Sequence, residues 1–449
     1  MEIQLYNTLT RNKETFKPLK QGEVSIYNCG PTVYDTPHIG NYRTFIMNDL
    51  IRRVFEYNDY KVDQVMNITD VDDKTIRRSR EEKIPLKELT LKYEKLFIEE
   101  SEKLNLKRPD HLIRATEYIP AMIELVGTLL ANGIAYKASD GVYVNIEKVK
   151  DYGTLAKLDL SHDSHERIAN DEYDKENARD FAVWKFKTPD DGDVSWDTPF
   201  GAGRPGWHIE CSAMAMNVLG PTIDIHTGGI DLIFPHHTNE IAQSESATGQ
   251  PFVHYWLHGA FMTVSDEKMA KSKKNFLKLG DLLDETISPL AYRYWLLTAH
   301  YRSPVNFTFE AVRAAQTALI RLLQLVGTYP EGGKIDSSYK NRFQEFINDD
   351  LDVPQAIALA WELVKDSNVS EPDKRATLID FDKVFGLKLD SAPRIEEEKI
   401  PEEIVALAEA REEARQTKDW KKADALRHEI ESRGFTIKDE TTGFKLRSS

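Results

Sequence analysis

The pattern that most limits the possible folds of this chain is a strand–helix–strand unit within residues 24–68. A short, mostly apolar run, Val24–Cys29, ends in Gly30-Pro31 and predicts a strand followed by a loop. A helical pattern begins near Ile39 and continues to Phe55, and Val62–Ile68 predicts the next strand. This order is typical of a parallel α/β sheet, in which the loop between the first strand and its helix is the natural ligand site.

The sheet pattern is then interrupted and resumes later. A helix is expected at Ile119–Asn132, followed by hairpin-like pieces and a polar, charged stretch, so residues 118–187 are interpreted as an insertion. Beyond it, Thr222–His226 predicts a strand and Thr227-Gly228-Gly229 a loop. Pro235 is well suited to the first position of a helix. Tyr255–Val264 predicts a further strand, which completes the sheet domain.

From about Phe309 the pattern is helical. We expect amphipathic helices at Ala311–Leu325, Tyr339–Asn348, Pro354–Lys365, Asp373–Phe385, Glu402–Gln416 and Trp420–Arg433. The segments around Phe435–Ile437 and Phe444–Leu446 could close the chain with a hairpin. The fold class is therefore α/β: a Rossmann-like parallel-sheet domain split by an insertion, then a helical bundle and a small C-terminal module.

Composition excludes several classes of protein. The 449 residues suggest two to four domains, because single cores stop growing near roughly 250–300 residues. No apolar run approaches a membrane span, and the first residues show no signal peptide, so we expect a cytoplasmic protein. A net charge of −15 argues against nucleic-acid binding through bulk charge, although a local basic surface is compatible with it. Two widely separated cysteines do not form a disulfide framework.

The first candidate site is the loop and helix start at Pro37-His38-Ile39-Gly40-Asn41. Backbone N–H groups at a helix start favour phosphate, and His38 and Asn41 can donate hydrogen bonds to its oxygens. Gly40 would let a flat adenine ring approach the backbone. The alternative is a helix cap with an incidental histidine.

The second candidate site is Lys268-Met269-Ala270-Lys271-Ser272, just after the last predicted strand of the sheet domain. Lys268 and Lys271 can contact a polyphosphate as compact point charges. A solvated basic turn is the alternative for this motif alone, and the presence of the first site in the same domain argues against it.

The third candidate site has the character of a metal site. On a helix starting at Pro235, His236 and Glu240 would share one face, at a spacing that suits zinc. Cys29 and Cys211 could complete the set, but these donors come from distant segments. Spacing alone therefore does not establish this set. His237 is the rival ligand to His236, and the alternative interpretation of the cysteines is two buried free thiols.

Together, these sites resemble the cysteinyl-tRNA synthetases, a branch of the class I aminoacyl-tRNA synthetases. The similarity runs over essentially the whole chain and is carried by long strings: Tyr27–Asp35, the HIGN form of the HIGH signature at His38–Asn41, Asn67–Lys74 and Gly203–Ser212.

The resemblance implies an activity and a set of residues. The family holds one zinc ion per subunit on two cysteines, a histidine and a glutamate, which match Cys29, Cys211, His236 and Glu240. The KMSKS loop of the family matches residues 268–272, with Lys271 as the ATP-binding lysine, and Trp207 matches a tryptophan that closes over the amino acid. The implied reaction is the adenylation of L-cysteine with ATP and Mg²⁺, followed by transfer to the 3′ end of tRNA(Cys).

The resemblance also implies a domain order. We expect a catalytic domain at 1–117 and 188–262 around a connective insertion at 118–187. A KMSKS and stem-contact region at 263–310, an anticodon-binding bundle at 311–390 and a small domain at 400–449 follow. We expect a monomer.

Three positions depart from the family pattern. Ala270 replaces the serine inside the KMSKS loop, Thr227 stands where glycine is common and Thr238 where glutamate is common. Two rival functions are a ligase that joins cysteine to an amino sugar with the same catalytic domain, and a non-catalytic tRNA-binding paralog. The amino-sugar ligases lack the full helical C-terminal region, and such paralogs commonly lose the signature residues, so both are the weaker hypotheses.

Overall fold

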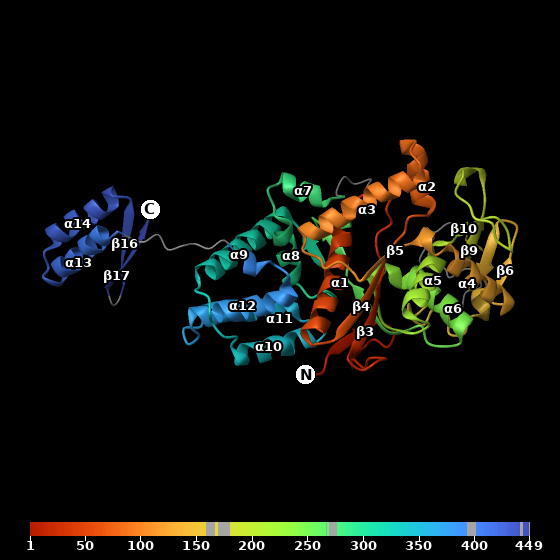
Figure 1. Ribbon diagram of the computed structural model, residues 1–449, viewed down its shortest axis with the longest axis horizontal. Helices are drawn as coiled ribbons and strands as arrows, with labels where there is room; N and C mark the ends of the chain where they lie inside the picture. The colour runs from red at the N-terminus through yellow and green to blue at the C-terminus, as the bar shows by residue number, and fades with distance from the viewer. Residues whose placement is uncertain are drawn as a thin grey trace. The chain divides into compact units, whose positions relative to one another are not determined.

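The chain forms two compact units, residues 1–322 with 330–390, and residues 323–329 with 391–449. The computed structural model describes residues 1–158, 167–168, 180–265, 267–268, 276–392, 401–440 and 443–448. Figure 1 shows the order of the elements along the chain. None of the helices among these residues combines the length and the apolar composition needed to span a membrane.

A parallel sheet forms the centre of the first unit, as predicted, and it has five strands. Its strands, in spatial order, are β12 (Val253–Gly259), β11 (Ile223–Gly229), β3 (Glu23–Asn28), β4 (Lys61–Ile68) and β5 (His111–Arg114). Because all five strands are parallel, their carboxyl ends meet at one edge, and the strand order changes direction between β3 and β11. That edge is where the candidate site residues gather.

A second sheet belongs to the insertion. Its strands are β10 (Gly203–Pro205), β9 (Asp180–Phe186), β7 (Gly141–Val144) and β6 (Ala135–Lys137), with β8 (Arg167–Ile168) pairing with β9. The insertion boundary expected at residue 187 falls in the connection from β9 to β10. The sheet of the insertion therefore includes residues beyond that boundary, as far as Pro205.

Three small sheets complete the strands. They are β1 (Gln4–Asn7) with β2 (Asn12–Thr15), β13 (Met262–Val264) with β14 (Glu267–Lys268) and β15 (Val305–Phe307), and β16 (Phe435–Glu440) with β17 (Gly443–Ser448).

The helices between Ile39 and Phe385 are α1 (Ile39–Tyr57), α2 (Asp73–Glu82), α3 (Leu86–Lys103), α4 (Ile119–Ala131), α5 (Trp207–Leu219), α6 (Thr238–Thr248), α7 (Leu279–Asp284), α8 (Pro289–Leu297), α9 (Phe309–Thr328), α10 (Ser337–Asn348), α11 (Val353–Lys365) and α12 (Glu371–Phe385). Helices α1, α4 and α9 to α12 lie close to their predicted positions, whereas α2, α3, α5, α7 and α8 were not predicted. Helices α10, α11 and α12 pack on one another, and α12 packs on α1. The bundle is therefore attached to the helix that begins at His38.

Two strand predictions were wrong, and tertiary contacts explain both. Residues Thr227–Gly229 continue strand β11, because Gly228 pairs with His258 and Gly229 with Gly259 of β12. A Cβ on Gly228 would lie 2.7 Å from His237 Cε1, so this glycine allows a histidine to pack against the strand. The single strand expected at Tyr255–Val264 is divided after Gly259, and β13 pairs with β15 in another sheet.

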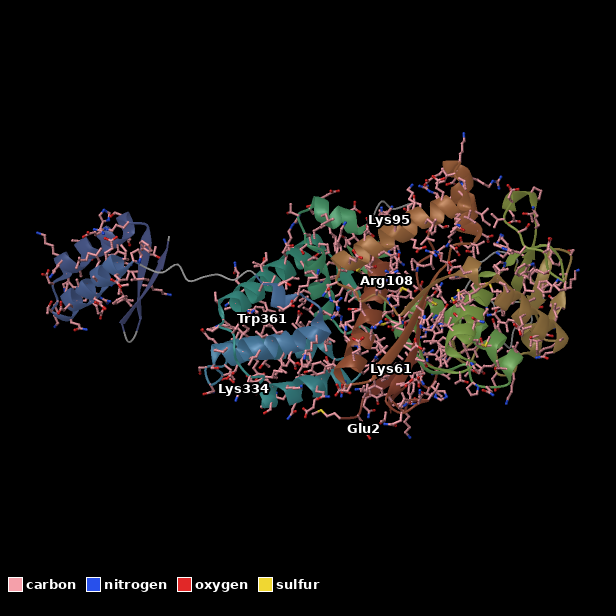
Figure 2. The ribbon with its side chains drawn as sticks, in the orientation of Figure 1. Glu2, Lys61, Lys95, Arg108, Lys334 and Trp361 are labelled. Carbon is pink, nitrogen blue, oxygen red and sulfur yellow. The ribbon has the colours of Figure 1, made fainter. Side chains whose placement is uncertain are left out.

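A large hydrophobic core joins the parallel sheet, the insertion sheet and the helices beside them. It contains Val65, Met122, Trp184 and Trp256 together with both cysteines of the chain. At the bundle side, Trp361 on α11, labelled in Figure 2, donates its indole N–H to the Tyr294 hydroxyl on α8 at 2.8 Å.

A buried ion network ties α1 to the bundle. Arg293 on α8 is fully buried, and its guanidinium donates to Asp49 Oδ2 at 2.5 Å and to the Phe385 carbonyl at 2.6 Å. Arg53 Nε donates to the same Asp49 oxygen at 2.7 Å. The Arg293 guanidinium on α8 thus connects the Asp49 carboxylate on α1 with the end of α12.

The second unit has its own small core. Helices α13 (Glu402–Gln416) and α14 (Trp420–Ser432) pack with the hairpin β16–β17 around Ile404, Ala408, Ile430 and Ile437. This arrangement confirms both predicted helices and the predicted closing hairpin.

Candidate active site

His38 caps helix α1 and is held by Asn41. The Asn41 backbone N–H donates to His38 Nδ1 at 3.2 Å, and the His38 N–H donates to Asn41 Oδ1 at 3.1 Å. Because Nδ1 accepts, the proton of the neutral ring lies on Nε2. The Asn41 side chain, whose oxygen is used by the cap, keeps its NH₂ group as a donor. Both side chains thus have the donors that a phosphate needs.

Cys29 directly follows strand β3 at the carboxyl edge of the sheet. The chain leaves the strand through Gly30, whose N–H donates to Asn67 Oδ1 at 2.8 Å. A Cβ on Gly30 would lie 1.7 Å from the Asn67 carbonyl oxygen, so only glycine allows this close passage. Cys29 is 8% exposed, and its sulfur faces the segment that follows β11.

Cys211 and Trp207 lie in the first half of helix α5. Cys211 is buried, whereas Trp207 at the start of the helix is half-buried. The Trp207 indole stacks on the His236 imidazole, with 4.3 Å between ring centroids and 28° between planes. The helix therefore brings one thiol and one aromatic cover to His236.

His236 and Glu240 meet, although the predicted start of their helix was wrong. Helix α6 begins at Thr238, after an irregular turn at Ile233–His237 in which Phe234 has extended backbone angles. His236 Nε2 nevertheless lies 3.0 Å from Glu240 Oε1, and both residues are buried. The four-residue spacing brought the two groups together without requiring a helix that starts at Pro235.

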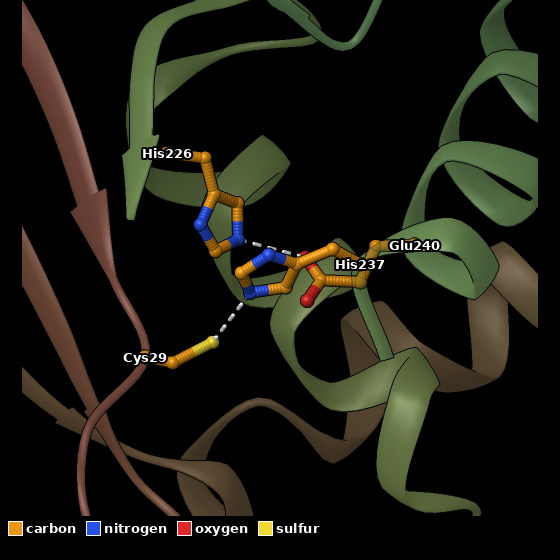
Figure 3. A group of neighbouring side chains, drawn as sticks. All are labelled: Cys29, His226, His237 and Glu240. Atoms are coloured by element: carbon orange, nitrogen blue, oxygen red, sulfur yellow. Dashed lines mark hydrogen bonds and ion pairs between the residues drawn. The ribbon is translucent and has the colours of Figure 1, made fainter. Parts of the chain in front are cut away.

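Two overlapping sets of donors are compatible with a metal ion. One is the expected set, Cys29, Cys211, His236 and Glu240. The other set consists of Cys29, His226, His237 and Glu240, so the two sets share Cys29 and Glu240 (Figure 3). In each set the ligand atoms all lie within 4.8 Å of one another, and every residue is buried. His226 Nε2 lies 2.9 Å from Glu240 Oε2, and His237 Nε2 lies 3.4 Å from Cys29 Sγ. Dashed lines in Figure 3 mark both contacts.

The donor chemistry of the expected set fits zinc. Tetrahedral zinc with bonds of about 2.0–2.3 Å needs ligand atoms roughly 3.3–3.8 Å apart, which the observed limit of 4.8 Å allows. Glu240 Oε1 faces His236 Nε2 at 3.0 Å, but it makes no hydrogen bond of normal geometry to this or any other described residue. A buried carboxylate oxygen in that state is suited to binding a cation.

The electrostatics of this cluster are strongly coupled. A hydrogen bond from Cys29 lowers the pKa of the Cys211 thiol to about 6, against the opposing effect of burial. Burial acts most strongly on Glu240 and would raise its pKa, but His226 and His236 outweigh it and lower the pKa to about 2. Burial raises the pKa of Cys29. Cys211 and Glu240 are therefore the anionic members at neutral pH.

Neutral histidines orient the ligand candidates from behind. His208 Nδ1 lies 2.9 Å from His236 Nδ1, and His258 Nε2 lies 2.8 Å from His237 Nδ1. Burial lowers the pKa of His208 and His237 well below the usual value, and that of His258 to about 3. Such partners fix which ring nitrogen of a ligand histidine faces a metal.

The sequence reasoning missed His226 and His258 as members of this cluster. His226 lies on β11 and His258 on the adjacent parallel strand β12. The only signal in the sequence that could have identified them is their position as single polar residues within apolar strand patterns. The departure at Thr227 also gains a structural reason here. Its hydroxyl donates to Asn48 Oδ1 on α1 at 2.7 Å and accepts from Asn28 Nδ2 on the neighbouring strand β3 at 2.6 Å.

The lysine-rich motif is only partly described. Lys268 ends strand β14, where it pairs with Thr263 of β13. Lys271 lies outside the described residues, as does Ala270.

Comparison with known proteins assigns the family. The chain is 45% identical to the cysteine–tRNA ligase of Methanosarcina mazei, over 100% of this chain and 99% of that protein. It is 43% identical to the corresponding ligase of Brachyspira hyodysenteriae, over 99% of both chains. The chain belongs to the cysteine–tRNA ligase family. Residues 15–317 match the family of class I (C) tRNA synthetase catalytic domains, and residues 397–447 match the cysteinyl-tRNA ligase anticodon binding domain.

Solved structures of other synthetases share the fold. Methionyl-tRNA synthetase of Mycobacterium tuberculosis, in complex with methionyl-adenylate, superposes with a TM-score of 0.57 at 17% identity, covering 84% of this chain and 92% of that one. A LeuRS of Agrobacterium radiobacter K84 reaches a TM-score of 0.58 at 11% identity, over 85% of each chain. This chain therefore has the fold of the class I tRNA synthetases.

Proposed function

We propose that this chain is a cysteine–tRNA ligase. It joins L-cysteine to ATP to form cysteinyl adenylate and pyrophosphate, and then transfers the cysteinyl group to the 3′ end of tRNA(Cys). Similarity to cysteine–tRNA ligases over the whole chain supports the reaction. The observation that carries the choice of amino acid is the buried set Cys29, Cys211, His236 and Glu240 at the carboxyl edge of the sheet.

We assign this set, rather than the one containing His226 and His237, as the zinc ligands. Two sulfur donors suit zinc better than one, and Cys211 already favours its thiolate form. A zinc ion held there supplies a soft acceptor that prefers the thiolate of cysteine to the hydroxyl of serine. Trp207, stacked on His236, covers the same position and would enclose the amino acid side chain.

Adenylation needs positioned charges more than a base. A carboxylate oxygen of cysteine forms a bond to the α-phosphorus of ATP while the bond to the β-phosphate oxygen breaks, and no proton has to be removed. His38 Nε2 and the Asn41 amide are the donors we assign to the phosphates, with Gly40 beside the adenine. Lys268 and Lys271 are assigned to the departing pyrophosphate, which carries Mg²⁺.

The remaining parts of the chain are assigned to tRNA. We propose that the bundle at 311–390 and the small domain at 400–449 both contact tRNA(Cys). The match of residues 397–447 to an anticodon binding domain favours an anticodon-binding role for the small domain, in addition to that of the bundle. The ligase acts in the cytoplasm as a monomer.

One pair of assays tests the proposal. ATP–pyrophosphate exchange should depend on cysteine and be at least about 100-fold weaker with serine, and total tRNA should accept labelled cysteine. Cysteine-dependent exchange without transfer to tRNA, but with transfer to an amino sugar, would favour the rival ligase. Absence of exchange with cysteine would favour a non-catalytic paralog.

A further inference from the structure

The start of helix α1 contacts the chain both before and after the lysine-rich motif at residues 268–272. On the preceding side, the Arg43 guanidinium donates to the carbonyls of Phe261 and Ser303, and to that of Tyr301 at 3.3 Å. Phe261 directly precedes strand β13, which leads towards the motif. Arg43 is 7% exposed, so this attachment is part of the core.

On the following side, residues Phe276–Lys278 lie against the His38 turn. The Ile39 N–H donates to the Leu277 carbonyl at 2.9 Å, and His38 and Lys278 form an isolated antiparallel bridge. The Phe276 ring meets the His38 imidazole edge-on, with 4.8 Å between centroids. The chain that leaves the motif is therefore in direct contact with the histidine assigned to phosphate.

An ion pair closes this contact. Lys278 Nζ donates to Asp35 Oδ1 at 2.7 Å, and the same oxygen accepts the Thr36 N–H at 2.8 Å. Asp35 lies three residues before His38, in the loop between β3 and α1. Lys278 is also the N-cap residue of α7, a position where Ser, Thr, Asp or Asn is preferred, and its side chain extends to Asp35.

We propose that Lys278 is a positioning residue for adenylate formation. Paired with Asp35, it holds the His38 turn and the chain after the lysine-rich motif in one fixed arrangement. The inference rests on the proposed function, because it concerns the adenylation step. That step depends on positioning, and a displacement of about 1 Å can slow such a reaction by about 100-fold.

The pair should matter more for rate than for stability. The Lys278 and Asp35 side chains are 37% and 21% exposed, and ion pairs of this kind contribute little to the stability of a fold. Lys278→Met should therefore lower kcat for cysteine-dependent ATP–pyrophosphate exchange about 10-fold, with KM for cysteine and Tm unchanged.

The test uses the full-length chain and four companion variants. Lys278→Arg keeps the pair and should retain most of kcat. Asp35→Asn should match Lys278→Met, and the double variant should be no slower than the slower single variant, because both remove the same contact. Lys92→Met is the matched control, since Lys92 on α3 forms a partly exposed ion pair with Glu82 at the end of α2, at 3.1 Å.

The outcomes separate the inference from the function on which it rests. Wild-type kcat in Lys278→Met would overturn the inference, and so would losses that multiply in the double variant. Wild-type kcat in Asp35→Asn beside a slow Lys278→Met would also overturn it, since Lys278 would then act on the nucleotide without Asp35. A wild-type chain with no cysteine-dependent exchange would instead refute the proposed function.

Discussion

Replacing Arg293 by methionine should destabilise the first unit strongly. Arg293 is fully buried, and its guanidinium is shared between Asp49 Oδ2 at 2.5 Å, the Phe385 carbonyl at 2.6 Å and the Leu104 carbonyl at 3.2 Å. Methionine fills a similar volume but offers no donor, so the variant isolates the electrostatic loss from the packing loss.

The size of the effect follows from what remains around Asp49. Removing one partner of a buried ion pair costs about 3–5 kcal/mol, because the other charge stays buried. Asp49 keeps Arg53 at 2.7 Å and the Lys107 N–H at 2.8 Å, which places the expected loss near the lower end of that range. For a unit of roughly 380 residues, whose entropy of unfolding is about 0.8 kcal/mol/K, we expect Tm to fall by about 4–5 °C.

The loss should depend on pH in a defined direction. Burial is the largest influence on the pKa of Asp49 and would raise it, but Arg293 and Arg53 outweigh burial, so the pKa is lowered. A lowered carboxyl pKa stabilises the fold above the pKa of the unfolded state, about 3.9, and this contribution is lost as the pH falls through the folded pKa. Removing Arg293 raises the pKa of Asp49 in the folded state, so the deficit of the variant should be complete near pH 7–8. It should shrink only as the pH falls through that raised pKa towards the lower pKa that Asp49 has in the wild-type fold, and so to below about pH 3.9.

The assay is thermal unfolding of both proteins across this pH range. Arg342→Met is the control, because Arg342 forms an exposed two-bond pair with Glu362 at 2.7 and 2.8 Å, and its loss should cost about 1 kcal/mol or less. A Tm within 1–2 °C of wild type, about the size of a single surface pair, would refute the reasoning. A deficit that did not change with pH would show that Asp49 is not the group left uncompensated.

Three further predictions concern the candidate site. Cys211→Ser should lower bound zinc well below one ion per chain, as measured by elemental analysis after dialysis, and full zinc retention would favour the donor set without Cys211. Trp207→Ala should raise KM for cysteine about 10-fold with KM for ATP unchanged, since the indole covers the ligand set, and an equal rise in both constants would contradict that role. Thr227→Val should cost about 1–3 kcal/mol in urea unfolding, because Asn28 and Asn48 each lose a buried partner, and a neutral result would show that the two amides rearrange.

Most of the fold could be predicted because its elements carry local periodic signals. Helix α1 begins at Ile39 and α13 spans Glu402–Gln416, as predicted, since an apolar stripe and a capping residue act within one or two turns. The predictions failed where a distant residue decided the local structure. Gly228 reads as a turn residue, but it lies in a strand because the His237 ring packs against it.

The sequence by itself determined the strand–helix–strand unit at residues 24–68, the helices of the last third of the chain, the position of His38 at a helix start, and the His236–Glu240 spacing. The tertiary structure alone decided which donors meet. Cys29 and Cys211 approach the same carboxylate because β3, α5 and α6 converge at one edge of the sheet, and the same convergence brings in His226. Contacts between residues so far apart in the chain depend on the packing of whole elements, which leaves no local periodic trace in the sequence.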